Sequence, residues 1–261
     1  MYKAVFSDFD GTLLTSDHKI SPRTLAAIQR ITRNGIPFVP ISARSPLGIL
    51  PYAKQIEDYN VIVAFSGALI LDRDMNALYS VNISPEDILS INRMLAAYPE
   101  LGVNYYTNND CVARDINNKW VAFEKSVTKI QIDPYDESVV YSPHKIQIIG
   151  DADEIITVEN HLKAEFPHLS ICRSHPNFLE VMEKSATKGN AVCFLESYFN
   201  VKEEEAIAFG DNFNDLDMLE NVGLGVAMGN APEEIKQAAN RITATNNEDG
   251  LALILEEIFS V

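Results

Sequence analysis

Short, uninterrupted apolar runs occur near both ends of the chain, and segments with the pattern of amphipathic helices separate them. The N-terminal runs are KAVFS, PFVPIS and VIVAFSG, and the C-terminal runs are EAIAFGD and GLGVAM. A strand that is apolar on both faces belongs inside a parallel sheet covered by helices. The two ends of the chain therefore predict an α/β domain with a parallel sheet.

Helix signals between the N-terminal runs support this architecture. In SPRTLAAIQRITRNG, Ser21 is placed as an N-cap, Pro22 lies in the first turn and Gly35 provides a C-terminal stop. Ile28 and Ile31 form the apolar stripe of the same segment. We expect this helix to pack on the sheet.

The middle of the chain has a different pattern. Between Asn82 and Ser185 the strand candidates are shorter and more amphipathic: GVNYYT, CVARD, HKIQIIG, LSICRS and FLEVME. Two helix candidates, PEDILSINRMLAAY and ADEIITVENHLKAEF, separate them. The pattern predicts an α+β insertion on an antiparallel sheet, so that residues 1–81 and 186–261 form the core and residues 82–185 the inserted domain. A cleft for a ligand is expected at such a junction.

The charge and the cysteine content restrict the partners. The 261 residues carry a formal net charge of −16, which repels nucleic acids and anionic membranes. The three cysteines are widely spaced and the N-terminal segment has no apolar leader run, so we expect reduced thiols and a cytoplasmic protein. The expected partner is a small molecule, bound by a monomer or a weak homo-oligomer.

Two aspartates stand at the end of the first apolar run. Asp8 and Asp10 are two residues apart, so their side chains leave an extended strand on the same side. A plain turn at Asp10-Gly11 would explain Asp10 but not Asp8. A calcium-binding EF-hand loop is excluded because Lys19 occupies the position that needs a glutamate.

A second group of acids follows a later strand in FGDNFNDLDML. Asp211 comes directly after AIAFG, and Asn214 and Asp215 begin the next helix. An N-cap would account for one aspartate but not for the whole group. Two acidic strand ends in one parallel sheet predict a site of hard oxygen ligands suited to Mg²⁺.

Donors and one cation follow other predicted elements. Ser42, a hydroxyl donor, ends a strand and is followed by Ala43 and Arg44, although serine is also common at helix starts. Lys188 lies at the start of a helix, where it opposes the helix dipole, so a plain surface position is slightly disfavoured.

The segments DFDGT, PISAR, TKG and GDNFND occur in the order and spacing of the four motifs of the haloacid dehalogenase superfamily. The long insertion resembles that of its Cof-type, or type IIB, phosphatases, and so do the endings AMGNAPEEIKQAA and TNNEDGLALIL. The resemblance covers nearly the whole chain. It implies a Rossmann-like parallel-sheet core with an inserted α+β cap domain.

The resemblance also implies roles for individual residues. Asp8 would be the nucleophile and Asp10 the general acid and base. The implied catalytic residues are Asp8, Asp10, Ser42 and Lys188, and the implied Mg²⁺ site comprises Asp8, Asp10, Asp211 and Asp215, the last as a support from behind. The implied phosphate contacts are Asp8, Gly11, Thr12, Ser42, Ala43, Lys188 and Asn214. The candidate substrate contacts are Arg44, Ser66, Gly67, His175 and Asn177, the last two from the position of their loop in the sequence and not from the resemblance.

Two positions depart from the family pattern. Family members often have glycine in place of Ala43 and asparagine in place of Ser66, which puts one backbone approach and one phosphate contact in doubt. We expect Asp8 to be ionised at pH 7, because Lys188 and Mg²⁺ would lower its pKa from about 3.9. Asp10 should be protonated when substrate binds and should later deprotonate the attacking water.

The predicted function is Mg²⁺-dependent hydrolysis of small phosphorylated metabolites, with sugar phosphates first, through an aspartyl-phosphate. A phosphosugar mutase or phosphotransferase of the same fold and a non-catalytic sensor of phosphorylated metabolites are the alternatives. The inserted domain is expected to act as a cap, with hinges near Ser80–Ser84 and Glu183–Thr187. Its loop RSHPNF, with His175 and Asn177, is either a substrate contact or a plain surface turn.

Overall fold

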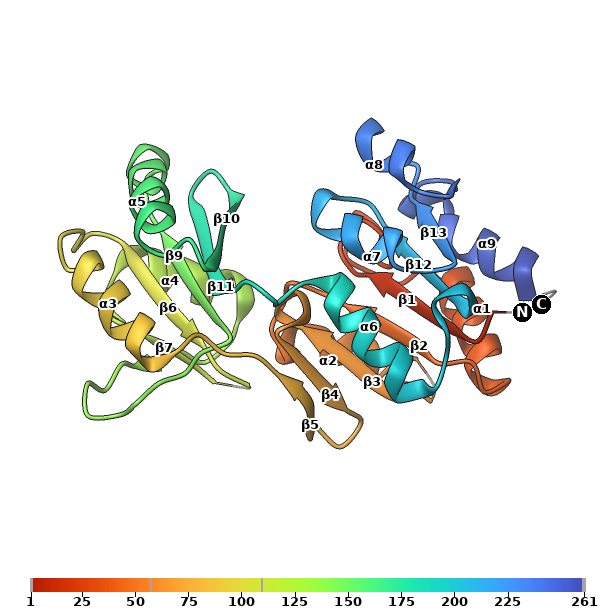
Figure 1. The fold of residues 1–261 in the computed structure, drawn as a ribbon, viewed down its shortest axis with the longest axis horizontal. Helices are drawn as coiled ribbons and strands as arrows, with labels where there is room; N and C mark the ends of the chain where they lie inside the picture. The colour runs from red at the N-terminus through yellow and green to blue at the C-terminus, as the bar shows by residue number, and fades with distance from the viewer. Residues whose placement is uncertain (1, 57, 109, 260–261) are drawn as a thin grey trace. The chain divides into compact units, whose positions relative to one another are not determined.

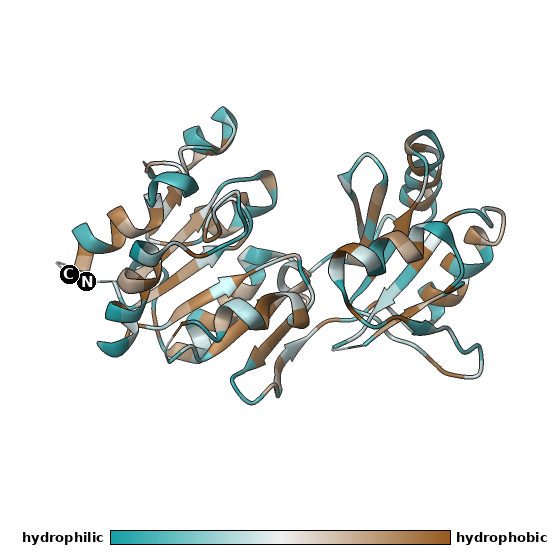
Figure 2. Ribbon diagram, turned by 180° about the vertical axis from the view of Figure 1, so that it is seen from behind, coloured by the Kyte–Doolittle hydropathy of each residue, from teal (hydrophilic) through white to brown (hydrophobic). Residues whose placement is uncertain are grey.

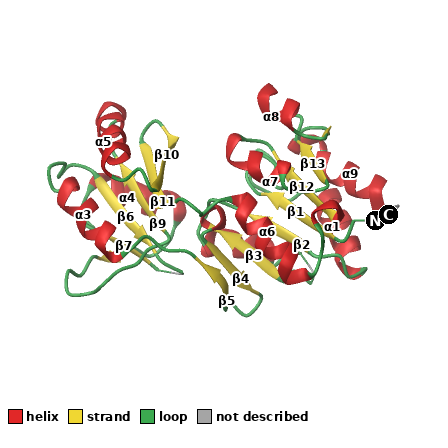
Figure 3. Cartoon of the chain, viewed as in Figure 1, coloured by secondary structure: helices red, strands yellow, loops and turns green. Residues whose placement is uncertain are grey.

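The computed structural model describes residues 2–56, 58–108 and 110–259, and it divides into two compact units. One unit contains the residues up to Tyr79 together with those from Thr187 onward, and the other is Ser80–Ala186. Each unit is built on its own sheet (Figures 1 and 3). The first unit is therefore discontinuous in sequence, and the second is a single contiguous segment.

An eight-stranded sheet runs through the first unit in the order β14-β13-β12-β1-β2-β3-β4-β5. Every described pairing from β14 to β3 is parallel, and β4 pairs with β3 antiparallel. The parallel sheet predicted from the apolar runs is confirmed. The strands are β1 (Ala4–Asp8), β2 (Phe38–Ile41), β3 (Val61–Ala64), β4 (Leu69–Asp72), β5 (Ala77–Ser80), β12 (Ala206–Gly210), β13 (Leu224–Ala227) and β14 (Arg241–Ile242).

Helices cover this sheet through apolar side chains of alternate strand residues. Ala4 and Phe6 of β1 belong to a buried cluster that also contains Val192 of α6 and Met218 of α7, and Figure 1 shows α6 in front of the strands. Helix α1 packs against α9. The helices are α1 (Pro22–Arg33), α2 (Pro46–Ala53), α6 (Lys188–Phe199), α7 (Leu216–Glu220), α8 (Glu233–Ala238) and α9 (Gly250–Phe259).

The first helix begins and packs as its sequence predicts. The hydroxyl of Ser21 accepts a hydrogen bond from the backbone N–H of Thr24, and Pro22 is the first helical residue. Ile28 and Ile31 are fully buried. Figure 2 shows the same division in colour, with brown strands inside and teal on the outer faces of the helices.

The second unit contains a six-stranded sheet in the order β10-β11-β9-β6-β7-β8. Its described pairings are antiparallel except for β7 with β8, so the predicted α+β insertion is confirmed as a fold. Helices α3 and α5 bury their apolar residues against one face of this sheet. The elements are α3 (Pro85–Leu95), β6 (Gly102–Tyr106), β7 (Cys111–Ala113), α4 (Lys119–Thr128), β8 (Asp133–Pro134), β9 (Lys145–Ile149), α5 (Ala152–Glu165), β10 (Leu169–His175) and β11 (Phe178–Glu183).

The sequence did not predict α4. Its residues, KWVAFEKSVT, are rich in aromatic and β-branched side chains, which are poor helix formers. The helix is fixed instead by Asn118, whose side chain caps the N–H of Trp120, and by the buried Val121 and Glu124.

Among the described residues, no helix has both the length and the apolar character needed to cross a membrane.

Candidate active site

The site is built on two neighbouring strand ends of the first unit. Strand β1 lies between β12 and β2, and its last residue, Asp8, is only 6% exposed. Asp211 directly follows the end of β12 at Gly210. Since β1 and β12 are parallel, both aspartates emerge at the same edge of the sheet. This is the edge at which open α/β sheets bind ligands.

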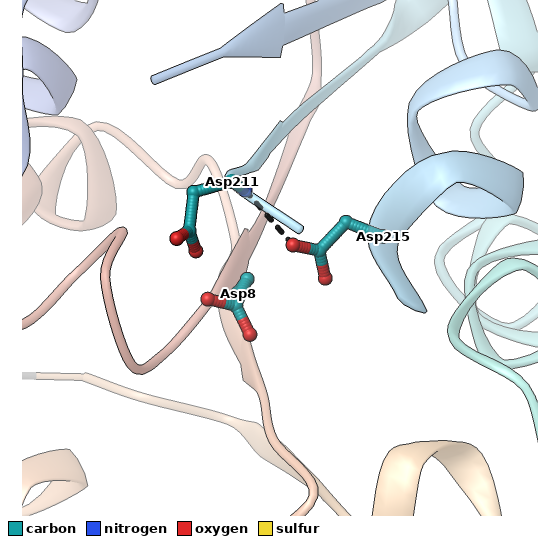
Figure 4. A group of neighbouring side chains, drawn as sticks. All are labelled: Asp8, Asp211 and Asp215. Carbon is teal, nitrogen blue, oxygen red and sulfur yellow. Dashed lines mark hydrogen bonds between the residues drawn. The ribbon is translucent and has the colours of Figure 1, made fainter. Parts of the chain in front are cut away.

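Three carboxylates converge at this edge. Asp8, Asp211 and Asp215 each place one carboxylate oxygen within 4.8 Å of the others. Figure 4 shows them approaching from β1, from the loop after β12 and from the start of α7. The two strand ends that the sequence indicated are thus brought together.

Lys188 supplies the positive charge of this cluster. It is the first residue of α6, its side chain is 1% exposed, and its Nζ contacts Oδ1 of both Asp8 and Asp215. The negative charges of these two carboxylates offset the repulsion between the Lys188 ammonium and the positive end of the α6 dipole. The next residue is also fixed, because the N–H of Gly189 donates to Asp217 Oδ2 at 3.0 Å.

Asp215 organises the loop after β12. Besides its contact with Lys188 it accepts two backbone hydrogen bonds at Oδ2, from the N–H groups of Asp211 at 2.8 Å and Asn212 at 2.9 Å. It is fully buried. Both of its oxygens are therefore engaged, which suits a residue that supports a metal site from behind.

Asp211 lies in a close-fitting cradle. Its Oδ1 accepts from the Thr12 hydroxyl at 3.0 Å, and its Oδ2 accepts from Asn230 Nδ2 at 3.2 Å. A Cβ on Gly11 would come within 2.4 Å of Asp211 Oδ2, and the φ of Gly11 is +88°. Glycine is thus required at position 11 both by the backbone and by the approach of the carboxylate.

The charge balance of the cluster favours an additional cation. Three carboxylates meet one lysine, and Asp8 Oδ2 is buried without a hydrogen-bond partner among the described residues. Buried polar atoms normally have a partner, so an orphaned carboxylate oxygen marks a place for a ligand. Hard oxygen donors of this kind suit Mg²⁺. The residues present therefore fit the divalent metal that the sequence predicts.

The pKa of Asp8 depends on its burial as well as on the neighbouring charges. Burial, together with the charges of Asp215 and Asp211, raises the pKa of Asp8 to about 8, although Lys188 acts in the opposite direction. Burial and Asp215 also raise the pKa of Asp211. Burial would lower the pKa of Lys188, but Asp8 and Asp215 outweigh it and raise that pKa. Burial thus works against ionisation of Asp8, and a bound cation would favour the ionised form.

Asp10 lies beside the cluster and is held by an arginine. Arg44 donates from Nε to Asp10 Oδ2 at 2.8 Å and from Nη2 to Asp10 Oδ1 at 2.6 Å. The guanidinium also lies over the rings of Phe9 and Tyr52, at 5.2 and 5.6 Å from their centroids. The Nδ1 atom of His18 lies 3.8 Å from Asp10 Oδ1. Both oxygens of the predicted acid are therefore bound in this conformation.

The remaining donors lie after β2 and β3. Ser42 is 1% exposed, and its Oγ accepts from the N–H of Arg44 at 3.1 Å. Its carbonyl accepts from the N–H of Ser66 at 2.8 Å, which joins the two strand ends. Phe65 and Ser66 have φ values of 49° and 53°, and Gly67 has a φ of 109°. Asparagine adopts the left-handed region more readily than serine, so the departure at Ser66 has a backbone cost.

Gly67 has a second constraint. A Cβ there would lie 2.2 Å from the carbonyl oxygen of Thr187, the residue before Lys188. The turn after β3 and the start of α6 therefore approach each other through bare backbone. This turn, η1 (Phe65–Gly67), also reverses the chain into β4, which the sequence did not predict.

The other predicted contacts are placed as follows. Ala43 lies between Ser42 and Arg44, and Asn214 is exposed in η3 (Phe213–Asp215). In the second unit, Asn177 Nδ2 donates to the carbonyl of Gly150 at 2.8 Å, and the His175 ring packs edge-on against Phe178. The amide of Asn177 thus has a structural partner. The predicted roles of Asn177 and His175 as substrate contacts stay predictions.

Sequence reasoning assigned no role to several residues that contact the site. Asn230 binds Asp211, Asn246 binds Asn230, and Asp217 caps the helix that carries Lys188. Asn230 and Asn246 stand in the two C-terminal segments, AMGNAPEEIKQAA and TNNEDGLALIL, that carried part of the family resemblance. The motifs were visible, but the contacts between distant loops were not.

Comparisons with known proteins identify the family of the chain. A family model described as haloacid dehalogenase-like hydrolase matches residues 5–255. A Haemophilus influenzae protein named "Putative phosphatase" is 74% identical over 259 residues, with 99% of each chain covered. The 5-amino-6-(5-phospho-D-ribitylamino)uracil phosphatase of Bacillus subtilis is 31% identical over 261 residues, covering 97% of this chain and 96% of the relative.

A solved structure extends the match to the fold. The crystal structure of a haloacid dehalogenase-like hydrolase from Bacteroides thetaiotaomicron has a TM-score of 0.90 and 31% identity, and the match covers 99% of this chain and 100% of that one. The resemblance stated from the four motifs is thereby confirmed. With a matching profile, relatives along its whole length and an acidic site at the expected strand ends, the chain belongs to the haloacid dehalogenase-like hydrolases.

Proposed function

We propose that this enzyme, a phosphatase of the haloacid dehalogenase type, hydrolyses small phosphorylated metabolites with Mg²⁺ through a phosphoryl-enzyme on Asp8. One observation carries the proposal. Asp8 is buried between Lys188 and Asp211 at a strand end, with Oδ1 held by the lysine and Oδ2 without a partner among the described residues. A carboxylate so placed can attack an electrophile whose charge the neighbouring groups neutralise.

The reaction would proceed in two steps. A carboxylate oxygen of Asp8 attacks phosphorus while the bond to the leaving oxygen breaks, and that oxygen takes a proton from Asp10. Asp10 then removes a proton from water, which attacks the aspartyl-phosphate and releases inorganic phosphate, so that free Asp8 is restored. Arg44 binds both Asp10 oxygens in this structure. It must therefore release at least one of them for the proton transfers.

Other residues of the chain would hold and neutralise the phosphoryl group. Lys188 is fixed against Asp8 and would pair with a phosphoryl oxygen, and the Ser42 hydroxyl can still donate because its oxygen accepts from Arg44 N–H. Asp8, Asp211 and the backbone carbonyl of Asp10 would hold Mg²⁺, with Asp215 behind them. When bound, Mg²⁺ supplies charge neutralisation at the phosphoryl oxygens and lowers the pKa of neighbouring carboxylates.

The substrate class is proposed more broadly than any single metabolite. One relative is named for a substrate that carries phosphate on a ribityl chain, which is a phosphoester of a sugar alcohol. Its identity of 31% supports phosphorylated sugars and similar polyols as the first compounds to test here. The cytoplasmic location and the monomeric or weakly associated state stay predictions.

A panel of phosphorylated metabolites would test the proposal. Each compound is incubated with the protein and Mg²⁺, inorganic phosphate is measured, and the organic product is identified. We expect stoichiometric phosphate and dephosphorylated product. Isomerised phosphoester without phosphate would indicate a mutase, and the absence of turnover across the panel would favour a sensor.

The acid role of Asp10 has a test of its own. Asp10→Asn should lower kcat/KM about 10²–10⁴-fold for an alkyl phosphate, whose poor leaving group needs a proton. The loss should be smaller for p-nitrophenyl phosphate, whose leaving group departs as a stable anion. The measurement is the ratio of the two losses. Equal losses for both substrates would contradict protonation of the leaving group by Asp10.

A further inference from the structure

Two C-terminal loops that play no part in the proposed chemistry contact the loop that follows β1. The first loop, after β13, contains Asn230. The second, η4 (Asn246–Glu248), contains Asn246 and Asn247. All three asparagines use their side chains to bind backbone or side-chain atoms of residues 11–16. These contacts connect the N-terminal and C-terminal parts of the chain beside the candidate metal site of Asp8, Asp211 and Asp215.

Asn230 lies at the centre of this arrangement. Its Nδ2 donates to the carbonyl of Gly11 at 2.8 Å and to Asp211 Oδ2 at 3.2 Å, while its Oδ1 accepts from the N–H of Asn246 at 3.0 Å. The partners fix which end of the amide is oxygen, because the first two are acceptors and the third is a donor. One side chain thus spans three segments of the chain.

The other asparagines hold the more distal part of the same loop. Asn246 Nδ2 donates to the carbonyl of Leu14 at 2.7 Å. Asn247 accepts from the N–H of Ser16 at 2.9 Å and donates to the Ser16 hydroxyl at 2.8 Å. Asn247 therefore binds the loop at Ser16, away from Gly11 and Asp211, so it offers a matched control for Asn230.

Hydrogen bonds from two neutral side chains orient Asp211. Its carboxylate is held by Thr12 at Oδ1 and by Asn230 at Oδ2. Without Asn230, Oδ2 would lose its hydrogen-bond donor beside Asp8 and Asp215, where like charges repel it. Groups that orient a metal-binding carboxylate contribute strongly to metal affinity even though they do not touch the metal.

We propose that Asn230 is a positioning residue: by binding Asp211 Oδ2 and the carbonyl of Gly11, it holds the Asp211 carboxylate in place for the divalent cation. The assignment rests on the proposed function, because it requires that Asp211 hold Mg²⁺. Asn246 supports this role, because its N–H fixes the orientation of the Asn230 amide. The AMGN and TNN segments thereby act on metal affinity from the far end of the sequence.

The test compares Asn230→Ala with Asn247→Ala in the full-length protein. Two quantities are measured: the Mg²⁺ concentration that gives half-maximal phosphatase activity, and the rise in melting temperature that Mg²⁺ produces without substrate. Asn230→Ala should raise the half-saturating Mg²⁺ concentration about 10-fold and shift the thermal response to higher Mg²⁺ by the same factor. At saturating Mg²⁺, its kcat should stay within about threefold of wild type, because no reacting group is lost.

Asn247→Ala should leave both Mg²⁺ responses at the wild-type position. Equal shifts in the two variants would assign the effect to general loosening of the loop and overturn the proposal. A fall in kcat with an unchanged Mg²⁺ response would overturn it as well. If wild type itself shows no Mg²⁺ response in either measurement, the proposed function fails and this assignment fails with it. If wild type responds normally to Mg²⁺ and Asn230→Ala responds in the same way, the assignment of Asn230 is overturned and the proposed function is not.

Discussion

Asp8→Asn is expected to reduce phosphate release about 1000-fold or more while leaving the fold intact. The amide keeps the size of the side chain and can still contact Lys188, but it cannot attack phosphorus. Residual activity is measured with the best substrate of the panel at saturating Mg²⁺. Near-normal release from a preparation free of wild-type enzyme would exclude the covalent mechanism.

The same substitution should stabilise the metal-free protein. The pKa of Asp8 is raised from 3.8 to about 8, chiefly by burial. A raised pKa in the folded state means that this carboxyl favours folding at low pH and progressively opposes it as the pH rises towards 8. In a chelator, Asp8→Asn should therefore melt above wild type by the largest margin near pH 8, and the margin should shrink towards pH 4.

That margin serves as a control on the kinetic result. An inactive variant that melts higher than wild type has lost chemistry rather than structure. A variant that melts lower throughout this pH range would contradict our description of Asp8 as a buried and incompletely compensated charge. Melting curves at four or five pH values, with and without Mg²⁺, are sufficient for this comparison.

Removal of divalent cations is expected to abolish turnover, and Mg²⁺ should restore it fully. Three carboxylates against one lysine leave a negative cluster that would repel a phosphate dianion. Phosphate release is measured after exhaustive chelation and again after titration with Mg²⁺, Mn²⁺ or Ca²⁺. Mn²⁺ should substitute at least in part. Ca²⁺ should inhibit, because its larger and looser ligand shell would misplace the reacting groups.

Full activity in the chelated protein would rule out the metal assignment. Lys188→Met provides a useful comparison, because it removes the positive charge of the lysine from the cluster and leaves Asp211 in place. We expect that variant to lose activity at every Mg²⁺ concentration. Recovery at high Mg²⁺ would mean that Lys188 serves only to balance charge.

The sheet and the strand-end acids were predictable because they depend on local pattern. Apolar runs such as AIAFG fix a buried strand, and the residue after such a run must emerge at the edge of the sheet. Asp8 and Asp211 could therefore be placed at one edge without knowing any contact. The N-cap at Ser21 is local in the same sense, since it requires only the residues of the first helical turn.

The features that escaped prediction depend on distant contacts or on unusual backbone. The turn before β4 has positive φ at Phe65 and Ser66, and the conformational preferences of these residue types do not predict it. Helix α4 is made of poor helix formers and depends on its cap and on the burial of Val121. Asn230 gains its importance only from Gly11 and Asp211. The expected ionisation of Asp8 at pH 7 includes the effect of bound Mg²⁺ and stays a prediction, whereas the burial that raises the pKa of Asp8 could not be read from the sequence.

The order in which the chain is synthesised makes the discontinuity of the first unit consequential. Strand β1 pairs with β12 through partners such as Ala4 and Ala206, so the N-terminal strand needs residues that emerge from the ribosome about 200 positions later. Ser80–Ala186 has its own sheet and apolar core, and its last residue precedes Ala206 by 20 positions. Pairings of such long range form slowly and leave apolar strands exposed. A nascent chain that ends before β12 can thus hold a folded insertion while β1, which carries Asp8, still lacks one of its two neighbours in the sheet.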